Sequence, residues 1–183
     1  MQYFKNRIFI SDADTVSPEW DLLSVKYHYA WMESQICKYL TDEKTVLDIG
    51  PGYGHWLKFY KSLEFDMFDG IELSKPMAEK LGCAFGNIVN YNNQNRYDVI
   101  NAIGILHHIM KDSDLIKAIE NIKEMSKGLI FIGTRFDFFN SRPISKFRKF
   151  RLLNFWKEHF DIVGIERSNP GKLRKHLDLL VCK

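Results

Sequence analysis

Between residues 45 and 134, short apolar runs alternate with longer amphipathic segments, and no other feature of the sequence constrains the fold as strongly. Strand-like runs that alternate with helical patterns are typical of a parallel sheet covered by helices. We expect strands at Val46–Gly50, Met67–Glu72, Cys83–Gly86, Tyr97–Gly104 and Leu129–Thr134. Helices are expected at Gly54–Leu63, Lys75–Leu81 and Ser113–Met125, the last because its apolar residues recur every three or four positions.

The flanking segments extend this pattern. Upstream, Pro18–Leu40 is predicted to be an aromatic-rich helix, and downstream Ile144–His159 is predicted to be a basic helix. Two further strands, Phe160–Glu166 and His176–Cys182, are separated by a short stretch with proline and glycine, which predicts a reversal of direction. The sequence therefore predicts an α/β fold: a doubly wound seven-stranded sheet, mostly parallel with an antiparallel last strand, and helices on both faces.

The length of 183 residues suits one domain with a substantial core and is too short for two domains of ordinary size. We expect residues 1–183 to form a single domain, with residues 1–44 as a helical lid segment and residues 45–183 as the core. No apolar run approaches the roughly 18 residues of a membrane span, and the N-terminus lacks the apolar region of a signal peptide. Three widely spaced cysteines indicate neither a disulfide framework nor a metal-ligand pair, so a cytoplasmic location is expected.

Three glycines at alternate positions follow the first predicted strand, in the stretch TVLDIGPGYGHW from Thr45 to Trp56. In an open α/β sheet, a glycine-rich turn lets a ligand approach the backbone and the N-terminus of the next helix. The turn therefore predicts a site for a nucleotide-like ligand. A dinucleotide site requires G-x-G-x-x-G, whereas the third-glycine position here is His55. No glycine-lysine pair follows, which excludes a P-loop.

Together with GIELS roughly twenty positions later and YDVINAIGILHHI at residues 97–109, the stretch VLDIGPGYG resembles the class I, Rossmann-like S-adenosylmethionine-dependent methyltransferases. The likeness spans Thr45–Thr134. It implies a sheet of six parallel strands and one antiparallel strand. It also implies S-adenosylmethionine as cofactor, with S-adenosylhomocysteine as product, and a small-molecule methyl acceptor.

The resemblance also implies cofactor contacts along the ends of the strands. Asp48 and the loop Gly50–Gly54 would face the methionine part of the cofactor, and Glu72 would hold the ribose hydroxyls. Asn87 would accept a hydrogen bond from the adenine amino group, although relatives often carry an aspartate there, and Ile88 would lie against the ring. The whole implied set is Asp48, Gly50, Pro51, Gly52, Gly54, Glu72, Leu73, Asn87, Ile88 and Ala102.

The chemistry of Glu72 supports its role without the family, because an ionised carboxylate can accept hydrogen bonds from two neighbouring hydroxyl donors. The competing interpretation is a surface acid that caps the helix beginning near Ser74.

His107 and His108 directly follow the fourth predicted strand, where relatives hold the methyl group. Methyl transfer needs alignment, exclusion of water and, for a hydroxyl acceptor, a base. Either histidine is a candidate base, and the alternative is that both have a packing role in the loop. The strand end reads NAIG and lacks the Pro-Pro motif of enzymes that methylate nucleic-acid bases, a Pro-Cys nucleophile, and an acid for magnesium. We therefore expect no metal, no nucleic-acid partner, and an oxygen acceptor ahead of nitrogen.

Two further segments have open interpretations. The aromatic stretch KYHYAWM, Lys26–Met32, occupies the place of a lid in relatives, and it is equally explained by a helix whose aromatics cover the sheet. The basic and aromatic run after Thr134 suits a phosphate or other anionic group, or else a solvated helix face. The leading hypothesis is an O-methyltransferase with a small polar or anionic acceptor. The alternatives are an idle methyltransferase-like binding subunit and, disfavoured by His55, a nicotinamide-dependent oxidoreductase.

Overall fold

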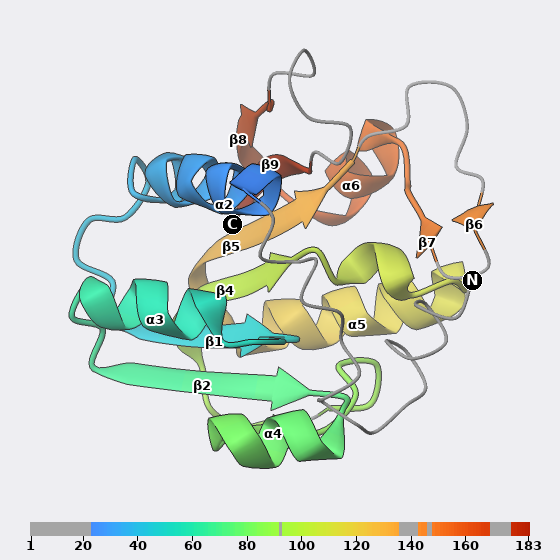
Figure 1. The fold of residues 1–183 in the computed structure, drawn as a ribbon. Coiled ribbons are helices and arrows are strands. Elements are labelled where there is room, and N and C mark those ends of the chain that lie inside the picture. Colours follow the sequence, from blue (N-terminus) through green and yellow to red (C-terminus); the bar gives the residue numbers. More distant parts are fainter. Residues whose placement is uncertain (1–22, 92, 136–142, 146–147, 169–176) are drawn as a thin grey trace.

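A seven-stranded sheet between two layers of helices forms the body of the molecule (Figure 1). The structure is a computed structural model that describes residues 23–91, 93–135, 143–145, 148–168 and 177–183. In these parts of the chain the strand order of the large sheet is β3-β2-β1-β4-β5-β9-β8, and a separate hairpin contains β6 and β7. All predictions for residues 1–22, including the first part of the Pro18–Leu40 helix, lie outside the described residues.

The seven strands of the large sheet agree with the predicted topology. Strand β9 is antiparallel to both of its neighbours, β5 and β8, and the other neighbouring strands are parallel. The predicted antiparallel last strand is therefore confirmed. The strands are β1 Thr45–Ile49, β2 Met67–Glu72, β3 Ala84–Phe85, β4 Tyr97–Ile103, β5 Ser126–Thr134, β8 Ile162–Glu166 and β9 Asp178–Cys182.

The helices cover the two faces because side chains alternate along each strand. On one face, Val46 and Val99 pack with residues of α2 and α3; on the other, Leu47 and Ile100 pack with residues of α5 and α6. The helices are α2 Leu23–Ile36, α3 His55–Ser62, α4 Lys75–Leu81, α5 Asp112–Met125 and α6 Leu153–His159, with a short 3₁₀ turn, η3, at Leu106–His108.

The predicted basic helix Ile144–His159 is wrong. In its place the chain forms strands β6 Pro143–Ser145 and β7 Arg148–Lys149, and then the shorter helix α6. The physical reason lies in Arg151, which is 1% exposed and whose Nε and Nη2 donate to Asp112 Oδ1 at 3.1 and 2.9 Å. A guanidinium buried against the start of α5 does not belong to a solvated helix face, so the run is bent around this ion pair.

Helix α2 lies on the sheet and contacts α3. Met32 and Ile36 are fully buried in the core of this face. The ring of Tyr29 stacks on His55 with centroids 4.2 Å apart, and His55 Nε2 lies 2.8 Å from Glu33 Oε1. Burial lowers the pKa of His55, and the neighbouring Glu33 carboxylate opposes this shift. These contacts support a covering role for the described part of this helix; a lid formed with residues 1–22 stays a prediction.

Asp98, at the start of β4, joins three segments through its carboxylate. Its Oδ2 accepts hydrogen bonds from the backbone N–H groups of Lys44 and Thr45 at 3.1 and 3.0 Å, and its Oδ1 lies 2.9 Å from Lys127 Nζ. Partial burial acts to raise the pKa of Asp98, but hydrogen bonds from Lys127, Thr45 and the backbone lower it to about 2. The carboxylate therefore stabilises the fold in its ionised form.

Asp98→Asn should reduce the free energy of unfolding at pH 7 by about 1–2 kcal/mol, since one oxygen and the charge are lost from a partly exposed site. A lowered pKa contributes stability above the unfolded value of about 3.9, and this is lost as the pH falls toward 2. Urea unfolding at pH 7, 5 and 3 measures the effect, with the exposed Asp66→Asn as a matched control. A wild-type advantage that did not shrink at pH 3 would contradict the assignment.

Candidate cofactor and acceptor site

The glycine loop between β1 and α3 depends on left-handed backbone at each glycine. Gly50, Gly52 and Gly54 have φ values of 67°, 55° and 74°, which L-residues with a Cβ rarely adopt. An added Cβ at Gly50 would lie 2.5 Å from Ile105 Cδ1, and one at Gly54 would lie 2.9 Å from Leu81 Cδ2. At Gly52 the nearest atom would be the Gly50 carbonyl oxygen, at 3.9 Å. Two of the glycines thus permit close packing, and Gly52 alone of the three borders open space.

Glu72, at the end of β2, joins the glycine loop to the next helix. Its Oε2 accepts a hydrogen bond from Gly52 N at 3.2 Å, and its Oε1 accepts one from Ser74 N at 2.9 Å. Ser74 is the N-cap of α4, and its side chain makes no capping hydrogen bond. The hydrogen bond from Ser74 N is the helix-capping contact that the competing interpretation of Glu72 predicts. A carboxylate offers about four lone-pair directions, so acceptor capacity for ribose hydroxyls is left.

Asp48 is fully buried and is held by an asparagine that the sequence analysis did not select. Asn101 Nδ2 donates to Asp48 Oδ1 at 2.7 Å, and the Tyr60 hydroxyl lies 3.3 Å from Asn101 Oδ1. The other carboxylate oxygen, Asp48 Oδ2, has no hydrogen-bond partner among the described residues. Burial raises the pKa of Asp48 to about 7; the hydrogen bond from Asn101 opposes the shift, and the charge of Glu72 adds to it. The signal for Asn101 was an amide between the apolar residues Ile100 and Ala102 in the middle of β4.

The residues near the predicted adenine position differ in how far they are exposed. Leu73 is 55% exposed beside the end of β2, and Phe85, which we had not selected, is 60% exposed on β3 opposite Glu72. Asn87 is exposed, and its Oδ1 accepts a hydrogen bond from Val89 N at 3.0 Å, in an Asx turn. Ile88 is buried in the core. The exposed apolar side chains at the ends of β2 and β3 thus come from Leu73 and Phe85.

Ala102 does not present its side chain to an open surface. It is fully buried in the cluster that contains α5 and α6 residues, on the opposite face of β4 from Asn101. Any contact of Ala102 with a ligand at the strand ends is therefore confined to its backbone. Ala102 was predicted only from its position in the strand. Because side chains alternate along β4, its side chain points to the face opposite that of Asn101.

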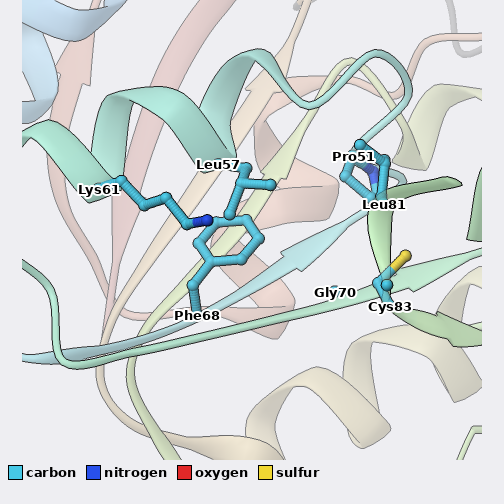
Figure 2. A pocket seen from close by; sticks show the side chains of 8 residues that line it. Pro51, Leu57, Lys61, Phe68, Gly70, Leu81 and Cys83 are labelled. Carbon is cyan, nitrogen blue, oxygen red and sulfur yellow. The ribbon is translucent and has the colours of Figure 1, made fainter.

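A pocket of about 210 Å³ lies between α3, α4 and β2 (Figure 2). Among the predicted cofactor residues only Pro51 lines it, so this pocket is distinct from the candidate site at Asp48, Gly52 and Glu72. Its lining residues are Pro51, Leu57, Lys61, Phe68, Gly70, Leu81, Gly82 and Cys83.

The two histidines lie in η3, directly after the residue that packs against the glycine loop. The contact between Gly50 and Ile105 brings this turn next to the loop. His107 is 5% exposed, and its ring lies 4.3 Å from that of His108 and 4.9 Å from that of Phe150. His108 is half-buried. The structure therefore places Ile105, two residues before His107, beside the loop, and His108 is the more accessible of the two histidines.

The segment that carries Phe150 is fixed to the start of α5. Besides its bonds to Asp112, Arg151 donates to the carbonyl oxygen of Met110 at 3.3 Å, and Lys149 forms an ion pair with Asp112 at 2.6 Å. The guanidinium of Arg135 lies 5.7 Å from the centre of the Phe150 ring. Lys149 and Arg151 are thus engaged within the protein, and Arg142 and Lys146 of the same basic run lie outside the described residues.

The structure is that of an α/β protein whose candidate ligand site lies at the carboxyl ends of β1, β2 and β4. Open space at Gly52, an unsatisfied carboxylate oxygen at Asp48 and the carboxylate of Glu72 fit a ligand that carries a cationic group and hydroxyls. Within the described residues, no group of three or more His, Cys, Asp or Glu side chains is placed to bind a metal, and no helix is long and apolar enough to cross a membrane.

Comparison with known proteins names the family. The family model described as a methyltransferase domain matches residues 27–170, most of the chain, and this protein therefore belongs to the methyltransferase-domain family. No curated protein sequence matches the chain significantly.

Solved structures of methyltransferases share the fold at low sequence identity. The 1,6-didemethyltoxoflavin-N1-methyltransferase of Burkholderia thailandensis superposes with a TM-score of 0.71 at 16% identity, over 99% of this chain and 87% of that one. DesVI of Streptomyces venezuelae gives 0.68 at 11%, over 91% and 98%. The N-methyltransferase NodS of Bradyrhizobium japonicum gives 0.63 at 15%, over 87% and 97%. The seven-stranded methyltransferase fold is thereby confirmed.

Proposed function

We propose that this protein binds S-adenosylmethionine and transfers its methyl group to an oxygen atom of a small polar or anionic acceptor, such as a sugar or a natural-product-like molecule. The observation that carries the proposal is the space at Gly52, whose N–H donates to the Glu72 carboxylate, in the glycine loop that directly follows Asp48 and Ile49. The similar toxoflavin-type methyltransferase was solved with bound S-adenosylhomocysteine, which is consistent with a cofactor site of this kind.

Each residue of the site has a role in this proposal. The bound cofactor supplies an activated methyl group on a sulfonium. Asp48 would accept a hydrogen bond from its ammonium group, Glu72 from its ribose hydroxyls, and Leu73 and Phe85 would offer apolar contact to the adenine. The loop at Gly52 would allow close backbone approach. Binding and alignment by these residues, together with exclusion of water, supply most of what an in-line methyl transfer requires.

A thermal-shift series with S-adenosylmethionine, S-adenosylhomocysteine and NAD tests the cofactor. A ligand at about 100 times its dissociation constant adds about 2.7 kcal/mol to the free energy of unfolding, which raises the melting temperature measurably. The proposal requires a shift with both sulfur compounds and none with NAD. The reverse pattern would favour the nicotinamide-dependent oxidoreductase, and no shift with any of the three would favour the idle subunit.

His108 is proposed as the base, because it is more accessible than His107 in the same turn. His108→Ala should retain S-adenosylhomocysteine affinity and lose about 10²-fold or more in turnover, since a positioned base contributes 10² to 10⁴. Wild-type turnover should rise with pH through about 6.5, as neutral imidazole accumulates. His107→Ala, the matched control, should have a smaller effect. Full turnover in both variants would return the histidines to a packing role.

The acceptor must first be found by a screen that follows methyl-donor consumption. Sugars, nucleotide-linked sugars and phenols represent the proposed oxygen acceptors, and their anionic members test the basic run. Amino sugars and other amines must be included, because KedS8, a sugar N-methyltransferase, shares this fold at a TM-score of 0.53 and 14% identity over 64% of this chain. Turnover with amines alone would contradict the proposed oxygen acceptor and leave the proposed cofactor intact.

A further inference from the structure

We propose that Asn101 is a positioning residue for Asp48: it fixes one oxygen of this carboxylate, leaves the other for the ammonium group of the cofactor, and makes cofactor binding depend on the ionisation of Asp48. The inference rests on the proposed cofactor, because the ammonium group belongs to S-adenosylmethionine or its product. Asn101 itself touches neither in this assignment, and it acts through Asp48.

The pairing of β1 with β4 brings the two side chains together. Asp48 and Asn101 are register partners in neighbouring parallel strands, so their side chains emerge on the same face of the sheet. Both are completely buried, and the Asn101 amide donates to Asp48 Oδ1 at 2.7 Å. A buried polar pair of this kind holds its geometry because every broken hydrogen bond inside the protein costs free energy.

Tyr60 of α3 fixes which way the Asn101 amide points. Its hydroxyl lies 3.3 Å from Asn101 Oδ1 and is placed to donate a hydrogen bond to it. The amide nitrogen is then directed at Asp48, where only a donor is compatible with an ionised carboxylate. A reversed amide would direct its oxygen at the Asp48 carboxylate. The chain Tyr60, Asn101, Asp48 therefore has a single favourable direction.

Among the residues that the structure describes, the titratable groups that act electrostatically on Asp48 do not include a cation. Glu72 from the end of β2, Tyr60 from α3 and Cys83 before β3 are the titratable groups coupled to it, and all of them are acids. The hydrogen bond from Asn101 is thus the described protein contact that favours the ionised form. A bound ammonium group would add the missing positive charge and a donor for Oδ2, which has no partner among the described residues.

This arrangement predicts a pH-dependent affinity. Burial raises the pKa of Asp48 to about 7, so the carboxyl is protonated in acid, and a ligand ammonium then binds without its counter-charge. Affinity for S-adenosylhomocysteine should rise by about tenfold per pH unit below pH 7 and level off above it. An analogue that lacks the α-amino group should bind with little dependence on pH.

Calorimetric titration of wild type, Asn101→Leu and Tyr60→Phe between about pH 5.5 and 8.5 tests the inference. Without the amide, Asp48 should ionise at higher pH. Asn101→Leu should therefore bind S-adenosylhomocysteine about tenfold more weakly at pH 7 and recover as the pH rises. Tyr60→Phe should move the midpoint of the pH-dependent affinity in the same direction by less. It replaces Asn101→Leu in the experiment if that variant does not fold. Asp48→Asn should remove the pH dependence.

The analogue without the amino group is the internal control, since its affinity should be nearly equal in wild type and Asn101→Leu. A loss that is the same at every pH, or one that the analogue shares, would mean that Asn101 only supports the local structure and would overturn the inference. Failure of wild type to bind S-adenosylhomocysteine at any pH would instead overturn the proposed function.

Discussion

Gly52→Val is expected to abolish S-adenosylhomocysteine binding, with a loss of at least about 100-fold, while the helix content stays largely intact. The residue borders open space, where an added Cβ would meet no atom nearer than 3.9 Å. A branched side chain would therefore enter the volume left for the cofactor without colliding with the core. The φ of 55° adds backbone strain, because L-residues rarely adopt this region. Calorimetric titration and far-ultraviolet circular dichroism measure the two effects.

The control variant must have the same backbone strain and must leave the volume proposed for the cofactor open. Gly82, the C-cap of α4, has a φ of 66°, and a Cβ there would meet nothing within 4 Å. Gly82→Val thus matches Gly52→Val in backbone cost and lies outside the Gly50–Gly54 loop. It should lose stability and retain affinity. If Gly52→Val bound with unchanged affinity, or if both variants lost binding equally, the glycine loop would not be the cofactor site.

Glu72→Ala is expected to weaken S-adenosylhomocysteine binding by roughly ten- to a hundredfold. Hydrogen bonds to an ionised carboxylate contribute about 1.5–3 kcal/mol each, which corresponds to this range. Glu72→Gln should fall between wild type and Glu72→Ala, since one acceptor oxygen remains. Glu79→Ala, which removes an exposed carboxylate from the adjacent α4, is the matched control and should bind as wild type does.

The contacts of Glu72 with Gly52 and Ser74 offer a second explanation for a loss, because the variant also releases the glycine loop. A cofactor analogue without one ribose hydroxyl separates the two effects. If Glu72 binds the hydroxyls, the analogue should bind more weakly than S-adenosylhomocysteine to wild type and equally well to Glu72→Ala. An identical penalty in both proteins would mean that Glu72 serves only the loop and the helix cap.

Sequence pattern alone was sufficient for most of the sheet. The strands at Met67–Glu72 and Tyr97–Ile103 lie where the apolar runs placed them, because two-residue alternation and turn residues act over a few neighbouring positions. The 14-residue α5 follows from its three- and four-residue spacing in the same way. The position of the glycine loop could also be predicted from the sequence, because glycine is the default residue where the backbone is left-handed.

The tertiary structure decided whatever depended on partners distant in the sequence. The sequence predicts Arg151 within a basic helix, whereas its burial against Asp112, 39 positions away, accompanies a hairpin and a shorter helix. Asn101 lies between apolar neighbours in the sequence, and only the register of β4 with β1 places it on Asp48, 53 positions away. The sequence does not distinguish the three glycines of the loop, yet in the structure Gly50 and Gly54 permit close packing and Gly52 borders open space. Local sequence determined the elements because their patterns are short-range, whereas ion pairs, strand register and the shape of the site arise only when distant segments meet.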